Sequence, residues 1–366
     1  MSRSTYDVVV AGGGAVGAAC AWRAAGRGLR VRVVDAGEPG AWDVAAGMLA
    51  PVSEAEPGDE ALAALNVRAA ERFGAFAAEL GLSYRETGTL AVARDGDEAA
   101  ALDRLLAFRT ELGLPVERLR PSQARRLEPA LAPTVRLALH APADHAVDPR
   151  GMVHALRRAL GGAVTAGRVT RLLIEDGRAA GVELASGEHV RAAHVVLATG
   201  VSEIDGIPDD ARVPVRPVKG QVLRLRDPRG AGLVERTIRG ADAYLVPRGD
   251  GRYVLGATME ERGADTAPTA GGVYELLRDM GELVPGVLEL DIAELRAGLR
   301  PATPDNLPAI GPSALDGLLH ATGHFRNGIL LAPLTADLIA GALAGEPLPD
   351  WAAPADPRRF NARVLA

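Results

Sequence analysis

Near the start of this 366-residue chain lies the stretch Asp7-Val-Val-Val-Ala-Gly12-Gly13-Gly14-Ala15-Val16-Gly17, which decides the fold. The apolar run predicts a strand, and the glycines predict a tight turn that opens a helix. Gly12 permits the turn, Gly14 lets the backbone approach a pyrophosphate, and Gly17 lets the helix pack closely on the strand. Because amides at a helix N-terminus bind phosphate, the stretch predicts a dinucleotide-binding unit.

A second strand supports this interpretation. The run Leu29-Arg-Val-Arg-Val-Val34 ends in Asp35, and a carboxylate about twenty residues after the glycines accepts the ribose hydroxyls of a dinucleotide. The glycine motif alone is a weak signal, so this spacing carries much of the prediction. Together the two strands predict an α/β fold of Rossmann type, equally compatible with NAD or FAD.

The composition narrows the class of protein. The length favours two domains, and 48% apolar with 24% charged residues is ordinary for a globular chain. A net charge of -6 argues against nucleic acid as a partner. With Cys20 as the single cysteine, no intramolecular disulfide or cysteine metal cage can form, and the seven histidines lack metal-binding spacing, so we expect no metal site.

Two apolar stretches could be mistaken for targeting or membrane segments. The first, Val8 to Ala11, is too short for a signal peptide and leads directly into the glycines. The second, Gly328 to Gly345, contains Pro333 and Asp337, which predicts a buried helix and no transmembrane segment. We therefore expect a cytoplasmic protein.

Periodicity indicates the remaining elements. A long helix is predicted from Glu60 to Leu80, because apolar residues recur along one face. After Leu82, strand-like segments and a charged helix near Asp97 to Leu112 suggest an inserted domain. Another helix is predicted to start at Pro149, with Asp148 as its N-cap. Further strands are expected at Thr89–Ala93, Ala163–Ile174, Ala179–Leu184, His194–Ala198 and Leu318–Thr322, and in a strand-rich region from Val213 to Gly298 that includes Gln221–Leu225, Ala243–Val246 and Tyr253–Ala257.

Six motifs spread over the whole chain carry a family resemblance. They are Ala45-Ala-Gly-Met-Leu49, Pro217-Val-Lys-Gly-Gln221, Tyr244-Leu-Val-Pro-Arg248, Gly256-Ala-Thr-Met259, Gly298-Leu-Arg-Pro-Ala-Thr303 and Gly323-His-Phe-Arg-Asn-Gly-Ile-Leu-Leu331. In these the chain resembles glycine oxidases of the ThiO type, which belong to the D-amino acid oxidase and sarcosine oxidase group of flavoproteins.

The resemblance implies a fold and an activity. The fold would be a discontinuous FAD-binding, Rossmann-like domain (1–80, 143–218 and 298–366) with a second, largely antiparallel-sheet substrate domain (81–142 and 219–297). The activity would be oxidative deamination of glycine or a similarly small amino acid, with hydride passing to flavin N5. The imine would give glyoxylate and ammonia or feed thiazole synthesis for thiamine, and oxygen would be reduced to peroxide. A homo-oligomer, a tetramer, is also implied.

The chemistry itself asks for few acid or base groups, because the protein mainly holds the substrate against the flavin. It does need a clamp for the substrate carboxylate, and the planar fork of arginine suits this task. Arg300, in Gly-Leu-Arg-Pro, is the first candidate. The resemblance makes Arg326 a second substrate or flavin contact and Tyr244 a hydroxyl donor to the same carboxylate.

The resemblance also implies the cofactor contacts, position by position. Gly328 to Leu330 would begin a helix whose amides face the pyrimidine edge of the flavin, where negative charge develops on reduction. The FAD should be noncovalent, because no histidine precedes His140 and Cys20 lies in the wrong segment. With the glycines Gly12, Gly14 and Gly17, the expected contacts are Ala15, Val16, Asp35, Ala36, Ala46, Gly47, Met48, Val169, His324, Phe325, Arg326, Asn327, Gly328, Ile329 and Leu330.

Three positions depart from the family or stand out. Hydroxyl side chains often precede the Ala-Ala-Gly run in the family, but this chain has Ala41-Trp42-Asp43-Val44. Asp242 stands where the family pattern has a histidine, which affects substrate range. Lys219 is the only lysine in the chain, so a compact ammonium is predicted to support the flavin or the oxygen reaction.

Other functions remain open at this point. The chain could be a dehydrogenase of D-amino acids or N-methyl amino acids, such as sarcosine, that passes electrons to an acceptor other than oxygen. It could also be a flavin-binding protein without turnover, or an NAD-binding dehydrogenase. The sequence does not rank glycine, sarcosine and D-alanine as substrates.

Overall fold

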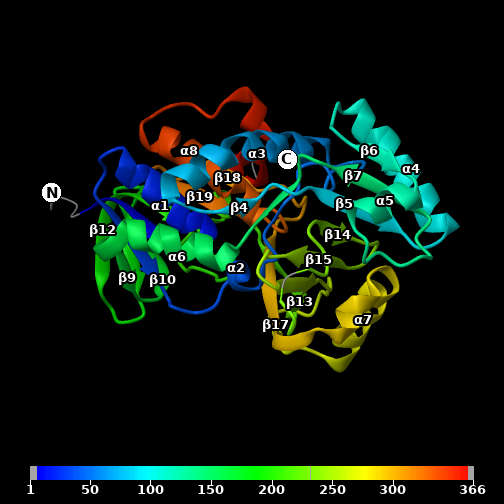
Figure 1. Ribbon diagram of the computed structural model, residues 1–366. Coiled ribbons are helices and arrows are strands. Elements are labelled where there is room, and N and C mark those ends of the chain that lie inside the picture. The colour runs from blue at the N-terminus through cyan, green and yellow to red at the C-terminus, as the bar shows by residue number, and fades with distance from the viewer. Residues whose placement is uncertain (1–5, 231, 362–366) are drawn as a thin grey trace.

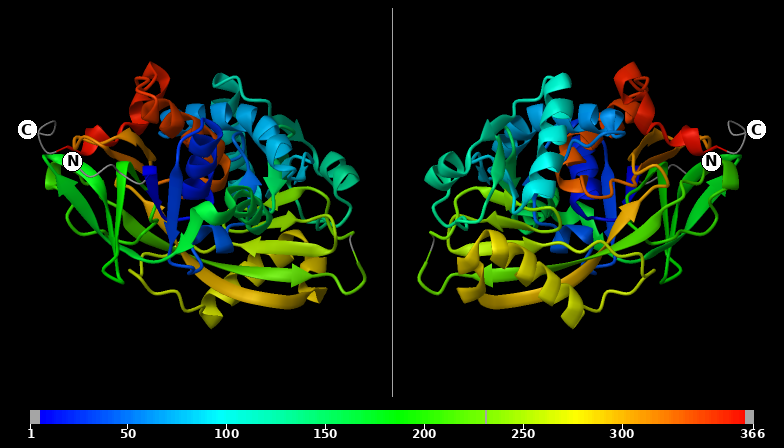
Figure 2. Two further views of the ribbon diagram at one scale, coloured as in Figure 1. Left: turned by 90° about the vertical axis from the view of Figure 1, so that its left-hand side faces the viewer. Right: turned by 90° about the vertical axis from the view of Figure 1, so that its right-hand side faces the viewer.

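Two eight-stranded sheets form the frame of the protein, together with a small three-stranded sheet. The computed structural model describes residues 6–230 and 232–361. Figure 1 shows the two large sheets side by side, each with its own helices, and Figure 2 shows the same arrangement from both ends. The expected α/β fold with a second sheet is confirmed.

The first sheet contains the predicted dinucleotide-binding unit. Its central strands run parallel in the order β9-β2-β1-β12-β19, with β9 at one edge. At the other edge β18 pairs antiparallel with β19, and the antiparallel hairpin β10-β11 pairs with the first half of β12. Because the middle of this parallel sheet is covered on both faces, the runs Val8–Ala11 and Val195–Leu197 are apolar and buried. The strands are β1 (Tyr6–Ala11), β2 (Val31–Asp35), β9 (Val164–Ala166), β10 (Val169–Glu175), β11 (Arg178–Leu184), β12 (His189–Leu197), β18 (Ala309–Pro312) and β19 (Leu318–Thr322).

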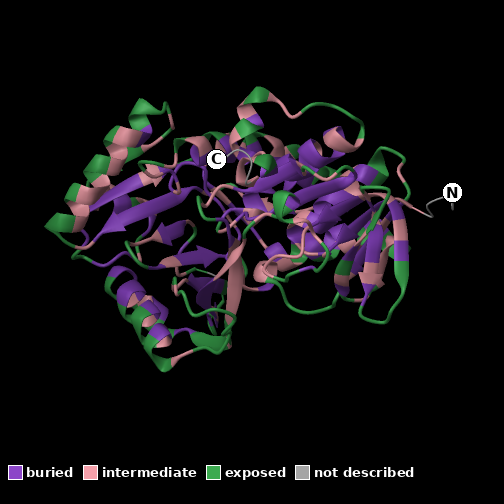
Figure 3. Cartoon of the chain, turned by 180° about the vertical axis from the view of Figure 1, so that it is seen from behind, coloured by how far each residue is buried: buried purple, intermediate pink, exposed green. Residues whose placement is uncertain are grey.

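Four helices share one hydrophobic core with this sheet, namely α1 (Ala15–Gly26), α3 (Glu60–Leu80), α6 (Pro149–Leu160) and α8 (Gly328–Leu343). The predicted bounds of α3 and the predicted start of α8 are confirmed. Helix α6 starts as expected, because the Asp148 side chain accepts a hydrogen bond from the amide of Arg150 at 3.1 Å. Figure 3 shows the buried sheets and the exposed outer faces of the helices.

The second sheet is largely antiparallel, in the order β17-β13-β16-β15-β14-β5-β7-β6. The pair β14 and β5 is parallel. Its strands are β5 (Thr89–Ala93), β6 (Glu117–Leu119), β7 (Leu137–Ala141), β13 (Arg216–Arg226), β14 (Thr237–Arg239), β15 (Tyr244–Pro247), β16 (Arg252–Gly256) and β17 (Asp291–Ala302), and its helices are α4 (Gly96–Glu111), α5 (Pro121–Leu127) and α7 (Ala270–Leu283).

Helix α7 lies inside the region that was predicted to be strand-rich, so that prediction was incomplete. Its start is capped by Thr269, whose hydroxyl accepts a hydrogen bond from the amide of Gly272 at 3.2 Å. The predicted domain boundaries after residue 218 and before residue 298 fall within β13 and β17, two paired strands of the second sheet. The division into domains stays a prediction.

Several short elements lie outside the two large sheets and their helices. They are α2 (Ala41–Val44), β3 (Met48–Leu49), β4 (Tyr84–Arg85), β8 (His145–Val147) and the short 3₁₀ turns Gly161–Ala163, Asp209–Ala211, Pro285–Glu289, Asp350–Ala355 and Pro357–Phe360.

Within the described residues, none of the helices combines the length and the apolar character that a membrane crossing requires.

Candidate active site

A cavity of about 1530 Å³ is lined by residues from both large sheets. It brings together segments that are separated by more than 300 residues in sequence, from the glycine turn to the start of α8. Among the predicted residues, Leu330 lies in the hydrophobic core with 2% exposure. The others line the cavity: Gly12, Gly14, Ala15, Val16, Gly17, Asp35, Ala36, Ala46, Gly47, Met48, Val169, Tyr244, Arg300, His324, Phe325, Arg326, Asn327, Gly328 and Ile329.

The glycine turn forms one end of the cavity. Gly12 has a φ of 97°, and a side chain there would overlap the carbonyl oxygen of Ala198. A Cβ on Gly17 would overlap the carbonyl oxygen of Gly12, so α1 packs against the turn only because this residue is glycine. Gly14 is the N-cap of α1, and the first-turn amides of that helix begin at the cavity wall.

Asp35 is held at the end of β2 by three donors. Its Oδ2 accepts a hydrogen bond from the Gly13 amide at 2.7 Å, and its Oδ1 accepts one from the Gly37 amide at 3.0 Å. Arg157 from α6 forms an ion pair with Oδ1 at 2.9 Å and donates to the Gly13 carbonyl at 2.9 Å. The carboxylate therefore stays fixed beside the turn, with accepting capacity left for a ribose hydroxyl.

The Ala-Ala-Gly run lies along the cavity because Gly47 adopts a φ of 78° and its carbonyl accepts a hydrogen bond from the Val147 amide. Arg248 donates to the carbonyls of Ala46 at 2.7 Å and Val147 at 3.0 Å. Burial lowers the pKa of Arg248 to about 10. The arginine of the Tyr-Leu-Val-Pro-Arg motif thus fixes the backbone of this run from the neighbouring sheet.

The segment that lacks the family's hydroxyl residues is stabilised in another way. Asp43 is 8% exposed and forms ion pairs with Arg150 at 2.8 Å and Arg296 at 3.2 Å, so its charge is neutralised. The Trp42 indole lies against Gly14 and Gly40, with the Arg157 guanidinium 5.5 Å from its ring centroid. Sequence reasoning did not assign Trp42 or Arg157 to the site.

At the start of α8, the chain returns to the cavity. The His324 side chain is buried, and its Nε2 lies 2.8 Å from the Thr335 hydroxyl. Burial lowers the pKa of His324 to about 3, so the imidazole is neutral at physiological pH. The N-cap of α8 is Asn327, and the amides that follow begin the second helix N-terminus at the cavity wall.

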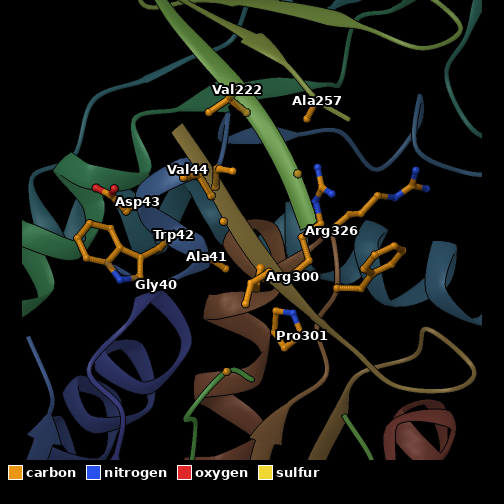
Figure 4. A pocket seen from close by; sticks show the side chains of 18 of the residues that line it. Gly40, Ala41, Trp42, Asp43, Val44, Val222, Ala257, Arg300, Pro301 and Arg326 are labelled. Atoms are coloured by element: carbon orange, nitrogen blue, oxygen red, sulfur yellow. The ribbon is translucent and has the colours of Figure 1, made fainter. Parts of the chain in front are cut away.

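The opposite end of the cavity is charged. Arg300 extends from β17 across Gly220 of the paired strand β13, where any side chain would overlap its guanidinium. Its Nη1 donates to the Thr258 carbonyl at 3.1 Å. Burial lowers the pKa of Arg300, and burial raises the pKa of Tyr244 while the nearby Arg300 charge opposes that rise. Figure 4 shows Arg300 and Arg326 on the same side of the cavity, away from Trp42 and Asp43.

Two carboxylates and a third arginine complete this end. Glu54 accepts a short hydrogen bond from Arg239, and its other oxygen lies 3.6 Å from Nε of Arg326. Glu56 lies 3.7 Å from Arg239 and 4.0 Å from Arg326. Sequence reasoning missed Glu54 and Arg239, since no spacing distinguishes them among 47 acidic and 41 basic residues.

The side chain of Lys219 is fully buried on the opposite face of β13 from Gly220. Its ammonium donates to the Asp265 carboxylate and to the Ala267 carbonyl, both at 2.6 Å. These bonds hold the loop before α7, which also lines the cavity at Thr266 and Pro268. The predicted role of Lys219 toward the flavin or oxygen stays a prediction.

The residues present fit a dinucleotide with a flavin. The cavity is larger than the roughly 300–1,000 Å³ of most small-ligand sites. It is lined by glycines that leave no room for side chains and by two helix N-termini. The glycine turn and the start of α1 lie at the end away from Arg300, while the start of α8 lies beside the strand that carries Arg300, which leaves the charged end for a smaller molecule.

Comparison with known proteins agrees with this geometry. The chain is 33% identical over 361 residues to the glycine oxidase of Bacillus licheniformis, covering 94% of this chain and 95% of that protein. Its fold superimposes on the crystal structure of glycine oxidase from Geobacillus kaustophilus with a TM-score of 0.89 and 31% identity, covering 96% and 98% of the two chains.

It is also 36% identical over 349 residues to the bifunctional protein ThiO/ThiG of Trichormus variabilis. That match covers 92% of this chain and 52% of the relative, so the chain spans about half the length of this relative. Residues 7–342 match the family described as DAO, FAD dependent oxidoreductase. The chain therefore belongs to the DAO family of FAD-dependent oxidoreductases.

Proposed function

We propose that this protein catalyses the oxidative deamination of glycine or another small amino acid. The substrate carboxylate is bound by Arg300 and Tyr244, and the amino acid lies between that clamp and the flavin. Noncovalent FAD is held by the glycine turn, Asp35, the run from Ala46 to Met48 and the start of α8. When bound, the flavin supplies a two-electron acceptor for the hydride of the substrate α-carbon.

The residues of the chain bind and orient the substrate. The Arg300 guanidinium provides two parallel donors for a carboxylate, and the Tyr244 hydroxyl provides a third. Neutral His324 is bonded to Thr335 inside the protein, so it takes no proton from the substrate amine. In this proposal the substrate reacts in the form whose amine is neutral, and the site contributes position and charge more than acid or base catalysis.

The observation that carries this proposal is the position of Arg300. It extends from the second sheet into the same cavity that the glycine turn and the start of α8 line from the first sheet. A half-buried arginine beside a half-buried tyrosine suits a carboxylate, because both supply donors that are partly shielded from water. The similarity to glycine oxidases supports the same substrate class.

An anaerobic reduction panel tests the proposal. Purified protein with its FAD is mixed without oxygen with glycine, sarcosine or D-alanine, and flavin absorbance is followed. We expect at least one of the three to bleach the flavin, and glyoxylate and ammonia to form from glycine in equal amounts. If none of the three bleaches it, the proposal is wrong and the protein binds flavin without this turnover.

The electron acceptor is tested in a second step. We propose oxygen, which takes up two electrons and two protons to give hydrogen peroxide. Mixing the reduced protein with air-saturated buffer in a stopped-flow instrument should restore the flavin spectrum within the turnover time. Slow reoxidation would indicate a dehydrogenase with another acceptor. A role in thiamine synthesis and a homotetramer remain parts of the proposal that rest on resemblance, and a cytoplasmic location is a part that rests on the sequence.

A further inference from the structure

The charged end of the cavity contains more positive charge than one substrate carboxylate needs. Arg239, Arg300 and Arg326 all line it. Arg300 and Tyr244 suffice to clamp one carboxylate, which leaves Arg239 and Arg326 as two further cations. If no carboxylate of the protein neutralised them, these two guanidiniums would attract a second acidic group on the substrate.

Glu54 is placed between these two cations. One of its oxygens accepts a hydrogen bond from Arg239, and the other lies 3.6 Å from Nε of Arg326. Only 9% of the Glu54 side chain is exposed. Burial by itself would raise the pKa of Glu54, but the charges of Arg239, Arg326 and Arg300 outweigh it and lower the pKa, so the group is ionised at neutral pH.

The turn that carries Glu54 is fixed by buried contacts. The carboxylate of Asp144 accepts hydrogen bonds from the amides of Val52 at 2.9 Å and Ser53 at 3.0 Å. Arg109, which is 2% exposed, donates to the carbonyls of Ser53 at 2.8 Å and Ala55 at 3.2 Å. Because the backbone on both sides of Glu54 is held in this way, its carboxylate stays between the arginines.

We propose that Glu54 determines the charge specificity of the substrate site. Its carboxylate takes the place, between Arg239 and Arg326, that the second carboxylate of a dicarboxylic amine would otherwise occupy. A substrate with one carboxylate binds at Arg300 without meeting this charge, whereas a second carboxylate is repelled. The inference rests on the proposed binding of the substrate carboxylate by Arg300 and Tyr244.

Two matched ligands measure this preference without any oxidation. Methoxyacetate and oxydiacetate share the same ether, but only oxydiacetate has a second carboxylate, and neither has an amine to oxidise. Their dissociation constants are obtained from the change in flavin absorbance of the FAD-loaded protein. The measured quantity is the ratio of the dissociation constant of oxydiacetate to that of methoxyacetate.

In the variant Glu54→Gln, we expect this ratio to fall by about tenfold or more, because a buried repulsive charge is removed. Glu54→Asp keeps the charge and should stay near the wild-type ratio. Glu56→Gln is the matched control: it removes the same charge from a side chain that is 44% exposed, and we expect a change of less than about threefold. FAD content and melting temperature show whether each variant is folded.

The variant Arg239→Gln keeps the proposal testable if Glu54→Gln fails to fold. It removes one of the two cations, so the ratio should rise by about tenfold. The proposal is overturned if folded Glu54→Gln keeps the wild-type ratio, if Glu54→Asp lowers the ratio as much as Glu54→Gln, or if folded Arg239→Gln leaves it unchanged. If the ratios change as expected but glycine does not bleach the flavin, the proposed function is contradicted and the inference about Glu54 is not.

Discussion

The two ends of the cavity are built on different principles. At the nucleotide end, glycines and the N-terminus of α1 create a surface of backbone groups, and the essential feature is the absence of side chains. At the substrate end, Arg239, Arg300, Arg326 and Glu54 supply charges that are largely removed from water. The first end tolerates a mutation only if the new side chain fits, and the second only if the buried charges stay balanced. Mutations at the nucleotide end should therefore reduce FAD content, and mutations at the substrate end should change substrate kinetics.

The largest effect is expected from removing the proposed clamp at the substrate end. Arg300→Met keeps the side-chain length but loses the charge and all donors, which should cost about 2–5 kcal/mol in transition-state binding, or roughly 30-fold to several thousand-fold in kcat/KM for glycine. FAD content should be retained. Arg158→Met, at an exposed position of α6, is the control and should leave kcat/KM unchanged. Wild-type kinetics for Arg300→Met would contradict the proposed clamp.

The opposite pattern is expected at the nucleotide end. Gly17→Ala introduces a methyl group onto the Gly12 carbonyl, and such overpacking costs about 1–3 kcal/mol. We expect reduced FAD content and a lower melting temperature, with little change in KM for the protein that still binds FAD. Gly26→Ala is the matched control on the same helix, because a Cβ there meets no atom within 4 Å. Equal FAD content in the two variants would disprove this steric account.

Acid should weaken the start of α8 through His324. The folded-state pKa of about 3 lies below the ordinary value of 6.5, so the folded state excludes a proton that the unfolded chain binds. The stabilisation is therefore full above pH 6.5 and is lost as the pH falls from 6.5 toward 3, by about 1.4 kcal/mol per unit. The stability difference between wild type and His324→Gln should shrink by about 2 kcal/mol between pH 7 and pH 5.

Urea unfolding at several pH values measures this difference. The exposed His189 serves as control site, because His189→Gln makes the same substitution at a side chain that does not pack against α8. A constant difference between wild type and His324→Gln would mean that the imidazole is not held neutral by burial.

The smallest effect is expected for the hydroxyl of Tyr244. Tyr244→Phe removes one donor next to the guanidinium of Arg300, and a single hydrogen bond contributes about 0.5–1.5 kcal/mol, or roughly 2-fold to 13-fold in KM for glycine. The control Tyr253→Phe removes a buried hydroxyl that accepts bonds from the amides of Gly232 and Leu233. It should lower stability without changing KM. If Tyr253→Phe changed KM more than Tyr244→Phe does, the assignment of the Tyr244 hydroxyl as a substrate donor would be contradicted.

Much of the nucleotide end could be predicted from the sequence, because its signals are local. Asp148 and Pro149 mark the start of α6, and the apolar stripe marks α3 within the predicted bounds. Helix α7 was missed although Leu276, Met280 and Leu283 have helical spacing, since strand-like segments on both sides dominate that region. The side chain of Leu330 packs in the core, and its predicted cofactor contact through the start of α8 stays a prediction.

The sequence by itself determined the βαβ unit and the glycine turn, because each depends on a few neighbouring residues whose types set the allowed backbone conformations. Motif resemblance added Arg300, Tyr244 and the start of α8. Only the tertiary structure decided which charges meet. Glu54 and Arg239 are 185 residues apart, and Arg248 reaches Ala46 across 202 residues. An ion pair between distant segments leaves no periodic pattern in the chain, since its energy depends on burial and distance, which exist only after folding.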